Sequence, residues 1–306
     1  MHHNIVVLDT GNPQLNNNQI FNLRITKNIS HTYAPMILLY KKALEKNINF
    51  ITPDLFFEIK DRSKKNILLF SQLISNNTQK MISLGAKPII LTCQESPYIA
   101  TRFYLKLKKY SSWFKHCFAF AGMQHNLYKH TKYHQMFFPE PYNTSDFHLI
   151  PYEHKKFLTT IVSNKIINTF PKDLLLKAIY GKQVNSLYKE RLRALEYFST
   201  IDGFEFFGRG WKQNLNSKLC KAYRGTLNNK QTILKKYKFS LCFENAVFPG
   251  YITEKIFDAM FAGSIPVYLG APDINKYIPA NAFINLKDFK GHDDLYRYLR
   301  CLTKKK

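Results

Sequence analysis

Short apolar runs alternate with longer amphipathic segments along this chain. Residues 88–93 form a continuous apolar run, which is typical of a strand buried on both faces of a parallel sheet. Apolar positions recur at helical spacing in residues 31–46 and, with a basic surface, in residues 98–109, and Gly85 is placed to cap a helix that ends at 80–85. Strands are predicted at residues 4–9, 49–57, 66–70, 88–93 and 116–122, the last of them closing the domain. The alternation predicts an open α/β domain over about the first 135 residues.

A second α/β domain follows a proline-containing segment. Residues 137–154 carry three prolines and little periodicity, which indicates an interdomain linker. Strands are then predicted at residues 157–163, 204–207, 237–243 and 264–269. Helices are predicted at residues 186–200, 229–236 and 290–306, and a further helix opens at residues 251–255 and ends near Gly263. The predicted domains are therefore residues 1–150, residues 151–290, and a basic C-terminal helix or tail at 291–306.

Charge and cysteine content narrow the range of functions. The 306 residues include 45 Lys and Arg against 21 Asp and Glu, a net charge of +24 that attracts nucleic acid, anionic lipid head groups or phosphorylated substrates. The five cysteines show neither zinc-ligand spacing nor a disulfide framework, so free thiols are expected. No apolar run reaches the ~20 residues of a membrane span, and no secretory signal opens the chain. We expect a cytoplasmic protein with peripheral contact at the anionic inner membrane surface.

Residues 237–270 carry the densest group of candidate functional side chains. The pattern predicts a strand, a loop, a helix and a second strand, and ligands of such parallel sheets bind beyond the carboxyl ends of the strands. Glu244 and Asn245 follow the first strand, and Lys255 lies in the first turn of the helix. A lysine there opposes the helix dipole unless it shares a bound anion such as phosphate with the helix amides. The alternative is a lysine that simply points into water.

The same stretch resembles the signature of the α1,3/α1,4-fucosyltransferases, the GDP-fucose-dependent glycosyltransferase family 10. The matching residues are Phe243-Glu244-Asn245, Tyr251-Ile252-Thr253-Glu254-Lys255 and Ile265-Pro266-Val267-Tyr268-Leu269-Gly270, followed by Tyr277-Ile278-Pro279 and Ala282-Phe283-Ile284. The resemblance is to bacterial or viral forms. It implies two Rossmann-like domains facing across a cleft, the GT-B architecture. It also implies inverting transfer of L-fucose from GDP-β-L-fucose to O3 of N-acetylglucosamine or glucose in a glycan, such as a lipopolysaccharide chain or a Lewis-type structure.

The resemblance also assigns roles to individual residues. Glu95, in a Glu-Ser-Pro just beyond the strand 88–93, matches the presumed general base; a turn acid or helix cap is the alternative. Arg191 best matches the arginine that contacts the GDP diphosphate, with Arg193 as its main competitor and Arg209 a weaker phosphate candidate. The other matching donor-site residues are a phosphate-binding lysine, a ribose-binding glutamate and residues around the nucleotide and sugar: Lys255, Glu254, Asn245, Tyr251 and Thr253. Glu244 is either part of this site or a structural acid that pairs loop amides.

We expect no metal and no other cofactor. Many glycosyltransferases hold Mg²⁺ or Mn²⁺ with an Asp-x-Asp pair, and no two aspartates of this chain are separated by a single residue. Oriented Arg and Lys side chains are the available substitute for stabilising a departing diphosphate. The expected partners are GDP-fucose and an oligosaccharide or glycolipid acceptor, with no nucleic acid.

Three other functions fit parts of the sequence. A basic nucleic-acid-binding protein fits the net charge, although the basic residues are spread over the whole chain and no recognised nucleic-acid motif is present. A related transferase that uses another nucleotide sugar, or an inactive sugar-binding relative, fits the signature. Binding of GDP-fucose would distinguish a fucosyltransferase from a nucleic-acid-binding protein. Turnover of GDP-fucose would distinguish it from a transferase that uses another nucleotide sugar and from an inactive relative.

Overall fold

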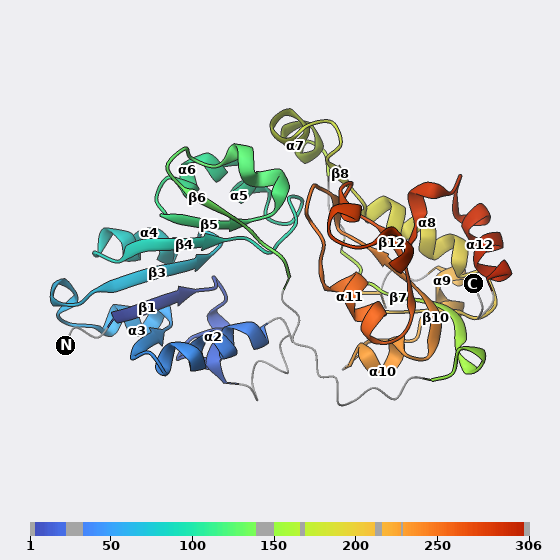
Figure 1. Cartoon of the computed structure of the whole chain (residues 1–306), viewed down its shortest axis with the longest axis horizontal. Coiled ribbons are helices and arrows are strands. Elements are labelled where there is room, and N and C mark those ends of the chain that lie inside the picture. Colours follow the sequence, from blue (N-terminus) through green and yellow to red (C-terminus); the bar gives the residue numbers. More distant parts are fainter. Residues whose placement is uncertain are drawn as a thin grey trace. The chain divides into compact units, whose positions relative to one another are not determined.

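The chain folds into two compact units, residues 1–141 and 142–306. The computed structural model describes residues 4–22, 33–138, 150–165, 169–211, 216–227 and 229–302. The division falls inside the segment that we interpret as a linker, of which residues 139–149 lie outside the described residues. Figure 1 shows the two units, and each is described by itself.

Unit 1 is built on a six-stranded, all-parallel sheet. The order is β2-β1-β3-β4-β5-β6, where the strands are β1 (Asn4–Asp9), β2 (Ile48–Ile51), β3 (Ile67–Gln72), β4 (Lys87–Thr92), β5 (His116–Ala119) and β6 (Lys132–Gln135). From β1 the chain passes to β2 on one side and then crosses to β3 on the other. The direction of winding therefore reverses between β1 and β3, which is where open α/β sheets bind ligands.

Helices connect these strands. They are α2 (Ala34–Leu44), α3 (Pro53–Glu58), α4 (Asn76–Ser83), α5 (Thr101–Leu105) and α6 (Leu107–Ser111). Helix α4 begins with a capping box: Ser75 Oγ accepts from Thr78 N, and Thr78 Oγ1 accepts from Ser75 N. As expected, Gly85 follows this helix with a positive φ of 94°.

Three predictions in unit 1 are wrong. Residues 53–57 form helix α3 rather than the end of a strand, because Pro53 starts a helix after β2 and Asp54 lies in its first turn. The segment 98–109 is broken into α5 and α6 at Lys106. The strand at 116–122 is shorter and is not the last, because β6 pairs in parallel with β5.

Unit 2 has a five-stranded parallel sheet with strand order β13-β12-β10-β7-β9. The strands are β7 (Lys156–Ile161), β9 (Phe204–Phe207), β10 (Tyr237–Phe243), β12 (Ile265–Leu269) and β13 (Ile284–Asn285). Two short strands, β8 (Asn185–Ser186) and β11 (Ala246–Val247), pair in antiparallel fashion beside it. Here the winding reverses between β7 and β10. The strands predicted at 204–207 and 237–243 are confirmed to the residue.

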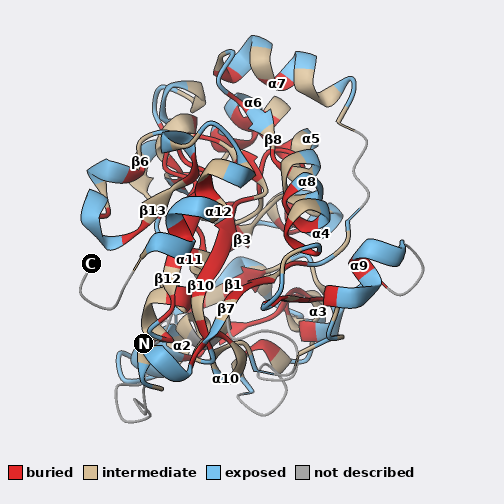
Figure 2. Cartoon of the chain, turned by 90° about the vertical axis from the view of Figure 1, so that its right-hand side faces the viewer, coloured by how far each residue is buried: buried red, intermediate tan, exposed pale blue. Residues whose placement is uncertain are grey.

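Unit 2 has six α-helices in its described residues. They are α7 (Lys172–Tyr180), α8 (Tyr188–Phe198), α9 (Ser217–Ala222), α10 (Gln231–Leu234), α11 (Glu254–Phe261) and α12 (His292–Cys301). Of these, α7 lies beside the short strand β8, away from the five-stranded sheet (Figure 1). The central strand β10 is buried along nearly its whole length (Figure 2), which explains its continuous apolar sequence. Leu195 of α8 and Leu295 of α12 join Phe239 and Val267 in one apolar core. Helix α11 ends as expected, with Gly263 at a φ of 66°.

Two expectations from composition concern the whole chain. All five cysteines are free thiols, as predicted. Within the described ranges, no helix has the length and apolarity that a membrane span needs.

Candidate functional site

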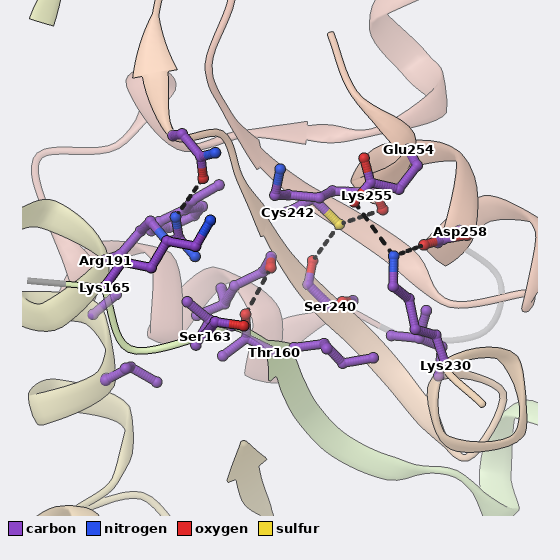
Figure 3. Close-up of a pocket in the computed structure, with 18 residues that line it drawn as sticks. Thr160, Ser163, Lys165, Arg191, Lys230, Ser240, Cys242, Glu254, Lys255 and Asp258 are labelled. Carbon is purple, nitrogen blue, oxygen red and sulfur yellow. Dashed lines mark hydrogen bonds and ion pairs between the residues drawn. The ribbon is translucent and has the colours of Figure 1, made fainter. Parts of the chain in front are cut away.

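A pocket of about 240 Å³ opens at the carboxyl ends of β7 and β10, where the winding of the second sheet reverses. Figure 3 shows its polar side chains. Strand β7 and the loop after it form one wall, helix α8 another, and β10 with helices α10 and α11 the rest. The charged lining residues are Lys165, Arg191, Lys230, Glu254, Lys255 and Asp258.

Helix α8 points one of its two central arginines into this pocket. Ala194 and Leu195 are buried against the sheet, and Arg191 lies three and four positions before them on the same helix face. Its Nη1 donates to Asn245 Oδ1 over 2.6 Å, and its guanidinium lies 5.1 Å from the centre of the Tyr188 ring. Burial lowers the pKa of Arg191 from its usual value, yet an arginine stays charged at neutral pH.

Arg193 lies on another face of the same helix. Its side chain is 70% exposed and forms an ion pair of 3.2 Å with Glu190 across one helical turn. It does not line the pocket. Of these two arginines, Arg191 lines the pocket and Arg193 does not, because the two side chains lie on different faces of the helix.

The loop between β10 and α11 is organised by Glu244, a carboxylate with no exposed surface. One oxygen accepts from the backbone N–H of Thr253 at 2.7 Å, and the other accepts from Thr253 Oγ1 at 2.8 Å and Lys255 Nζ at 2.9 Å. Glu244 therefore orders the start of α11 and holds Lys255 at the wall of the pocket. The structural interpretation of Glu244 fits this geometry, and Lys255 has a partner without any bound anion.

A second charged cluster closes the other end of the pocket. Lys230 Nζ lies 3.3 Å from a Glu254 oxygen and 3.0 Å from an Asp258 oxygen. Burial acts to raise the pKa of Glu254, but the charges of Lys255 and Lys230 outweigh it and lower that pKa to about 2. Burial raises the pKa of Asp258 from its usual value, and Lys230 opposes that shift.

The pocket keeps positive charge that no carboxylate neutralises. Lys230 is paired with two carboxylates and Lys255 with one. Within the described residues, neither Arg191 nor Lys165 forms an ion pair, and Figure 3 shows both at the end of the pocket away from Lys230. Arg191 is half-buried and Lys165 is exposed. Cations without a carboxylate partner favour an anionic ligand, and an arginine can bridge two phosphate oxygens. The arrangement is suited to a phosphorylated ligand.

The structure brings some of the predicted site residues together and separates others. Arg191, Asn245, Glu254 and Lys255 line the pocket, as predicted. Three others are buried in the layer behind its wall: Glu244, Tyr251 and Thr253. Tyr251 is not in the lining, but its hydroxyl accepts from Asn245 Nδ2 at 3.5 Å. Arg209 lies outside the pocket, on an exposed turn after β9.

Three charged pocket residues were not predicted. Asp258 lies one turn after Glu254 on the same helix, so helical spacing could have found it. Lys165 follows the strand β7 at the sheet edge where ligands bind, which is a weaker signal. Lys230 reaches the pocket from a short separate helix, and no local pattern indicates that position.

Glu95 belongs to unit 1. It lies three residues beyond β4 at the carboxyl edge of the first sheet, partly exposed. Its backbone oxygen accepts from the Tyr104 hydroxyl at 2.9 Å, while its carboxylate has no hydrogen-bond partner or ion pair among the described residues. A carboxylate so placed is free to accept a proton from a ligand.

No metal site is indicated by the part of the chain that is described, where no three His, Cys, Asp or Glu side chains gather as a metal-binding group. Metal independence stays a prediction, and chelation tests it.

Solved structures share this fold. A crystal structure of an α1,3-fucosyltransferase aligns with 97% of this chain and 77% of its own, with a TM-score of 0.55 and 19% identity. The Anabaena protein Alr3699/HepE, solved in complex with UDP and glucose, aligns with 99% of this chain and 91% of its own, with a TM-score of 0.55 and 11% identity. Two parallel α/β units, each with its own reversal point, are the GT-B fold of glycosyltransferases, as predicted.

Sequence comparisons match the C-terminal part of this chain to fucosyltransferases. The sequence model described as "Glycosyltransferase family 10 (fucosyltransferase) C-term" matches residues 179–306. The α-(1,3)-fucosyltransferase FucT of Helicobacter pylori is 45% identical over 76 residues, which are 25% of this chain and 16% of that protein. The mouse 4-galactosyl-N-acetylglucosaminide 3-α-L-fucosyltransferase 9 is 41% identical over 88 residues, 28% of this chain and 24% of that protein. The family-10 model thus matches residues 179–306, which include the signature, and the predicted resemblance is confirmed for this part of the chain.

Proposed function

We propose that this protein is an inverting α1,3-fucosyltransferase. It transfers L-fucose from GDP-β-L-fucose to a glycan hydroxyl, O3 of N-acetylglucosamine or glucose, and forms an α-fucoside. The observation that carries the proposal is the pocket at the β7/β10 reversal point, because the family signature builds it and Arg191 and Lys165 leave it with unneutralised positive charge. A similar fold has been solved with GDP-fucose, at a TM-score of 0.51 and 20% identity.

The charged groups of the pocket suit a sugar nucleotide. Arg191 and Lys165 bind the diphosphate, and Lys255, held by Glu244, adds a third cation from the wall that α11 forms. Glu254 stays ionised because its pKa is lowered to about 2, so its carboxylate accepts hydrogen bonds from ribose hydroxyls. Lys230 pairs with Glu254 from the side of helix α10, and Asp258, one turn after Glu254 on α11, pairs with the same lysine.

Transfer breaks the bond between the anomeric carbon of fucose and the diphosphate oxygen. The electron pair leaves with GDP, and cations that are already oriented lower the free energy of this charge, which is usually the largest contribution in such sites. The acceptor oxygen attacks the opposite face of the sugar, which inverts the anomeric centre. Glu95, supplied by unit 1, takes the proton of the acceptor hydroxyl. Cationic side chains replace the metal in this scheme.

The acceptor of the relatives guides the choice of assay. The mouse relative is named for 4-galactosyl-N-acetylglucosaminide, and we propose the same class of acceptor here. The test incubates the full chain with this disaccharide and GDP-fucose, in EDTA and with Mn²⁺, and detects the product by mass spectrometry. We expect fucosylation in EDTA. GDP-mannose and UDP-galactose are the controls: transfer from either of them but not from GDP-fucose would support another nucleotide-sugar transferase and overturn the proposal.

A further inference from the structure

Unit 1 contains a second polar pocket, of about 190 Å³, that the donor site does not use. It lies at the carboxyl ends of β1 and β2, next to the start of α4, at the reversal point between β1 and β3. Its walls are the loop after β1 and the first turn of α4. The polar lining residues are Asp9, Thr10, Asn12, Asn16, Thr52, Ser75, Asn76 and Asn77.

The frame of this pocket is held by Asp9, which is 1% exposed. One carboxylate oxygen accepts from the backbone N–H of Gly11 at 3.0 Å, and the other accepts from Ser75 Oγ at 2.7 Å and Thr78 Oγ1 at 2.6 Å. These bonds tie the loop after β1 to the cap of α4. The Asp9 carboxylate is thereby occupied and contributes to shape rather than to ligand binding.

The far end of the loop is also fixed. The Asn18 backbone N–H donates to Thr52 Oγ1 at 3.1 Å, Thr52 N donates back to Asn18 Oδ1 at 3.0 Å, and Asn17 N donates to Asp54 Oδ2 at 2.8 Å. A loop bonded at both ends has its binding shape before the ligand arrives, so less conformational entropy is lost on binding.

The free groups of this pocket are neutral amides. The side chains of Asn16, Asn76 and Asn77 have no hydrogen-bond partner within the described residues. An amide both donates and accepts hydrogen bonds, as a sugar hydroxyl does. The lining has no Lys, Arg or His, so a phosphate finds no countercharge here, in contrast to the pocket of unit 2. Its volume of about 190 Å³ is smaller than the 240 Å³ of the donor pocket.

From this juxtaposition we infer that the pocket at the β1/β3 reversal point binds a neutral sugar residue of the acceptor, adjacent to the residue that receives fucose. The inference rests on the proposed function. Strands β1, β3 and β4 are consecutive in the sheet, so the ends of β1 and β4 are two strand spacings apart, about 10 Å. Glu95 follows β4. A disaccharide in the pocket of β1 therefore reaches Glu95 along the same sheet edge with its other sugar.

The double variant Asn76→Ala/Asn77→Ala tests the inference in the full-length chain. Both side chains are exposed and make no intramolecular hydrogen bond among the described residues, so the fold is kept. Loss of two neutral hydrogen bonds weakens binding of 4-galactosyl-N-acetylglucosaminide on the order of tenfold, measured as a Kd by saturation-transfer NMR and as an acceptor KM. The Kd for GDP is unchanged. Gln79→Ala, an exposed change on the same helix outside the pocket, is the matched control and leaves both values unchanged.

A second variant, Asn16→Ala, removes an amide from the opposite wall and is expected to weaken the acceptor in the same way. Unchanged acceptor affinity in both variants would overturn the inference, and so would an equal loss of GDP affinity or no glycan binding by the wild-type chain. The proposed function fails separately: glycan binding that depends on Asn76 and Asn77, without any transfer from GDP-fucose, would leave the sugar pocket standing and remove the fucosyltransferase assignment.

Discussion

Replacing Arg191 by alanine is the sharpest single test of the donor pocket. The guanidinium is half-buried, is fixed by a 2.6 Å hydrogen bond to Asn245, and has no carboxylate partner within the described residues. The variant therefore removes a cation whose charge only a ligand can neutralise. A hydrogen bond to a charged group is worth about 1.5–3 kcal/mol. The Kd for GDP should rise by a factor of roughly 10–150.

Arg193→Ala is the matched control for this change. It alters the same helix two residues away and removes only an exposed ion pair to Glu190, which contributes about 0–1 kcal/mol to stability. GDP affinity should stay at the wild-type value. Arg191→Lys keeps the charge but loses the forked geometry, so its Kd should fall between those of the wild type and Arg191→Ala.

Isothermal titration calorimetry of the full chain with GDP measures these constants. Thermal unfolding of each variant verifies that the fold is intact, because Arg191→Ala also removes the hydrogen bond of a charged group to Asn245, worth about 1.5–3 kcal/mol, from the folded state. Wild-type affinity in Arg191→Ala would refute the reasoning. Equal weakening by Arg193→Ala would refute it too, because long-range charge rather than the phase of α8 would then set the affinity.

Three further predictions concern the other charged residues. Lys255→Ala leaves the buried carboxylate of Glu244 without its cation, so the free energy of unfolding should drop by about 3–5 kcal/mol and GDP affinity should fall. Adding Glu244→Gln to this variant should restore the stability but not the GDP affinity. Restored GDP affinity would contradict the phosphate role of Lys255. Glu95→Gln should keep GDP binding and lose transfer by about 10²–10⁴-fold; full transfer activity would place the base elsewhere. The lowered pKa of Glu254, about 2 against 4.5, adds stability that is present above pH 4.5 and lost as pH falls toward 2. Glu254→Gln should flatten the acid side of the stability curve, and an unchanged slope in denaturant titrations from pH 5 to 3 would contradict this.

The central strands and the signature helix were predictable because burial requires apolar residues at nearly every position of such a strand and along one face of such a helix. β10 is buried at nearly every position, so its apolar run could only be a strand of a covered sheet. The edge strand β6 was missed for the opposite reason. Its sequence, Lys-Tyr-His-Gln, is only partly buried at three positions and exposed at the first, and it carries no hydrophobic period. Residues 53–57 were included in the strand predicted at 49–57, although Pro53 favours a helix start.

The candidate site was predictable where it is local. Asn245, Glu254 and Lys255 come from one stretch of sequence whose strand, loop and helix hold them together. The choice between Arg191 and Arg193 depends on which face of α8 packs on the sheet, and a sequence alone leaves both open. Lys230 and Glu254 are 24 positions apart in the sequence, and the packing of α10 on α11 brings their side chains together. Only the tertiary structure therefore shows that Lys230 belongs to the site. Tyr251 belongs to the signature but lies behind the wall, supporting Asn245.

Calorimetric titration of the 306-residue chain with GDP-fucose in the presence of EDTA tests the central claim most directly. The account predicts saturable binding of one GDP-fucose per chain without added metal, weakened by Arg191→Ala and not by Arg193→Ala. No binding in EDTA, or binding that appears only with Mn²⁺ and ignores Arg191, would contradict it.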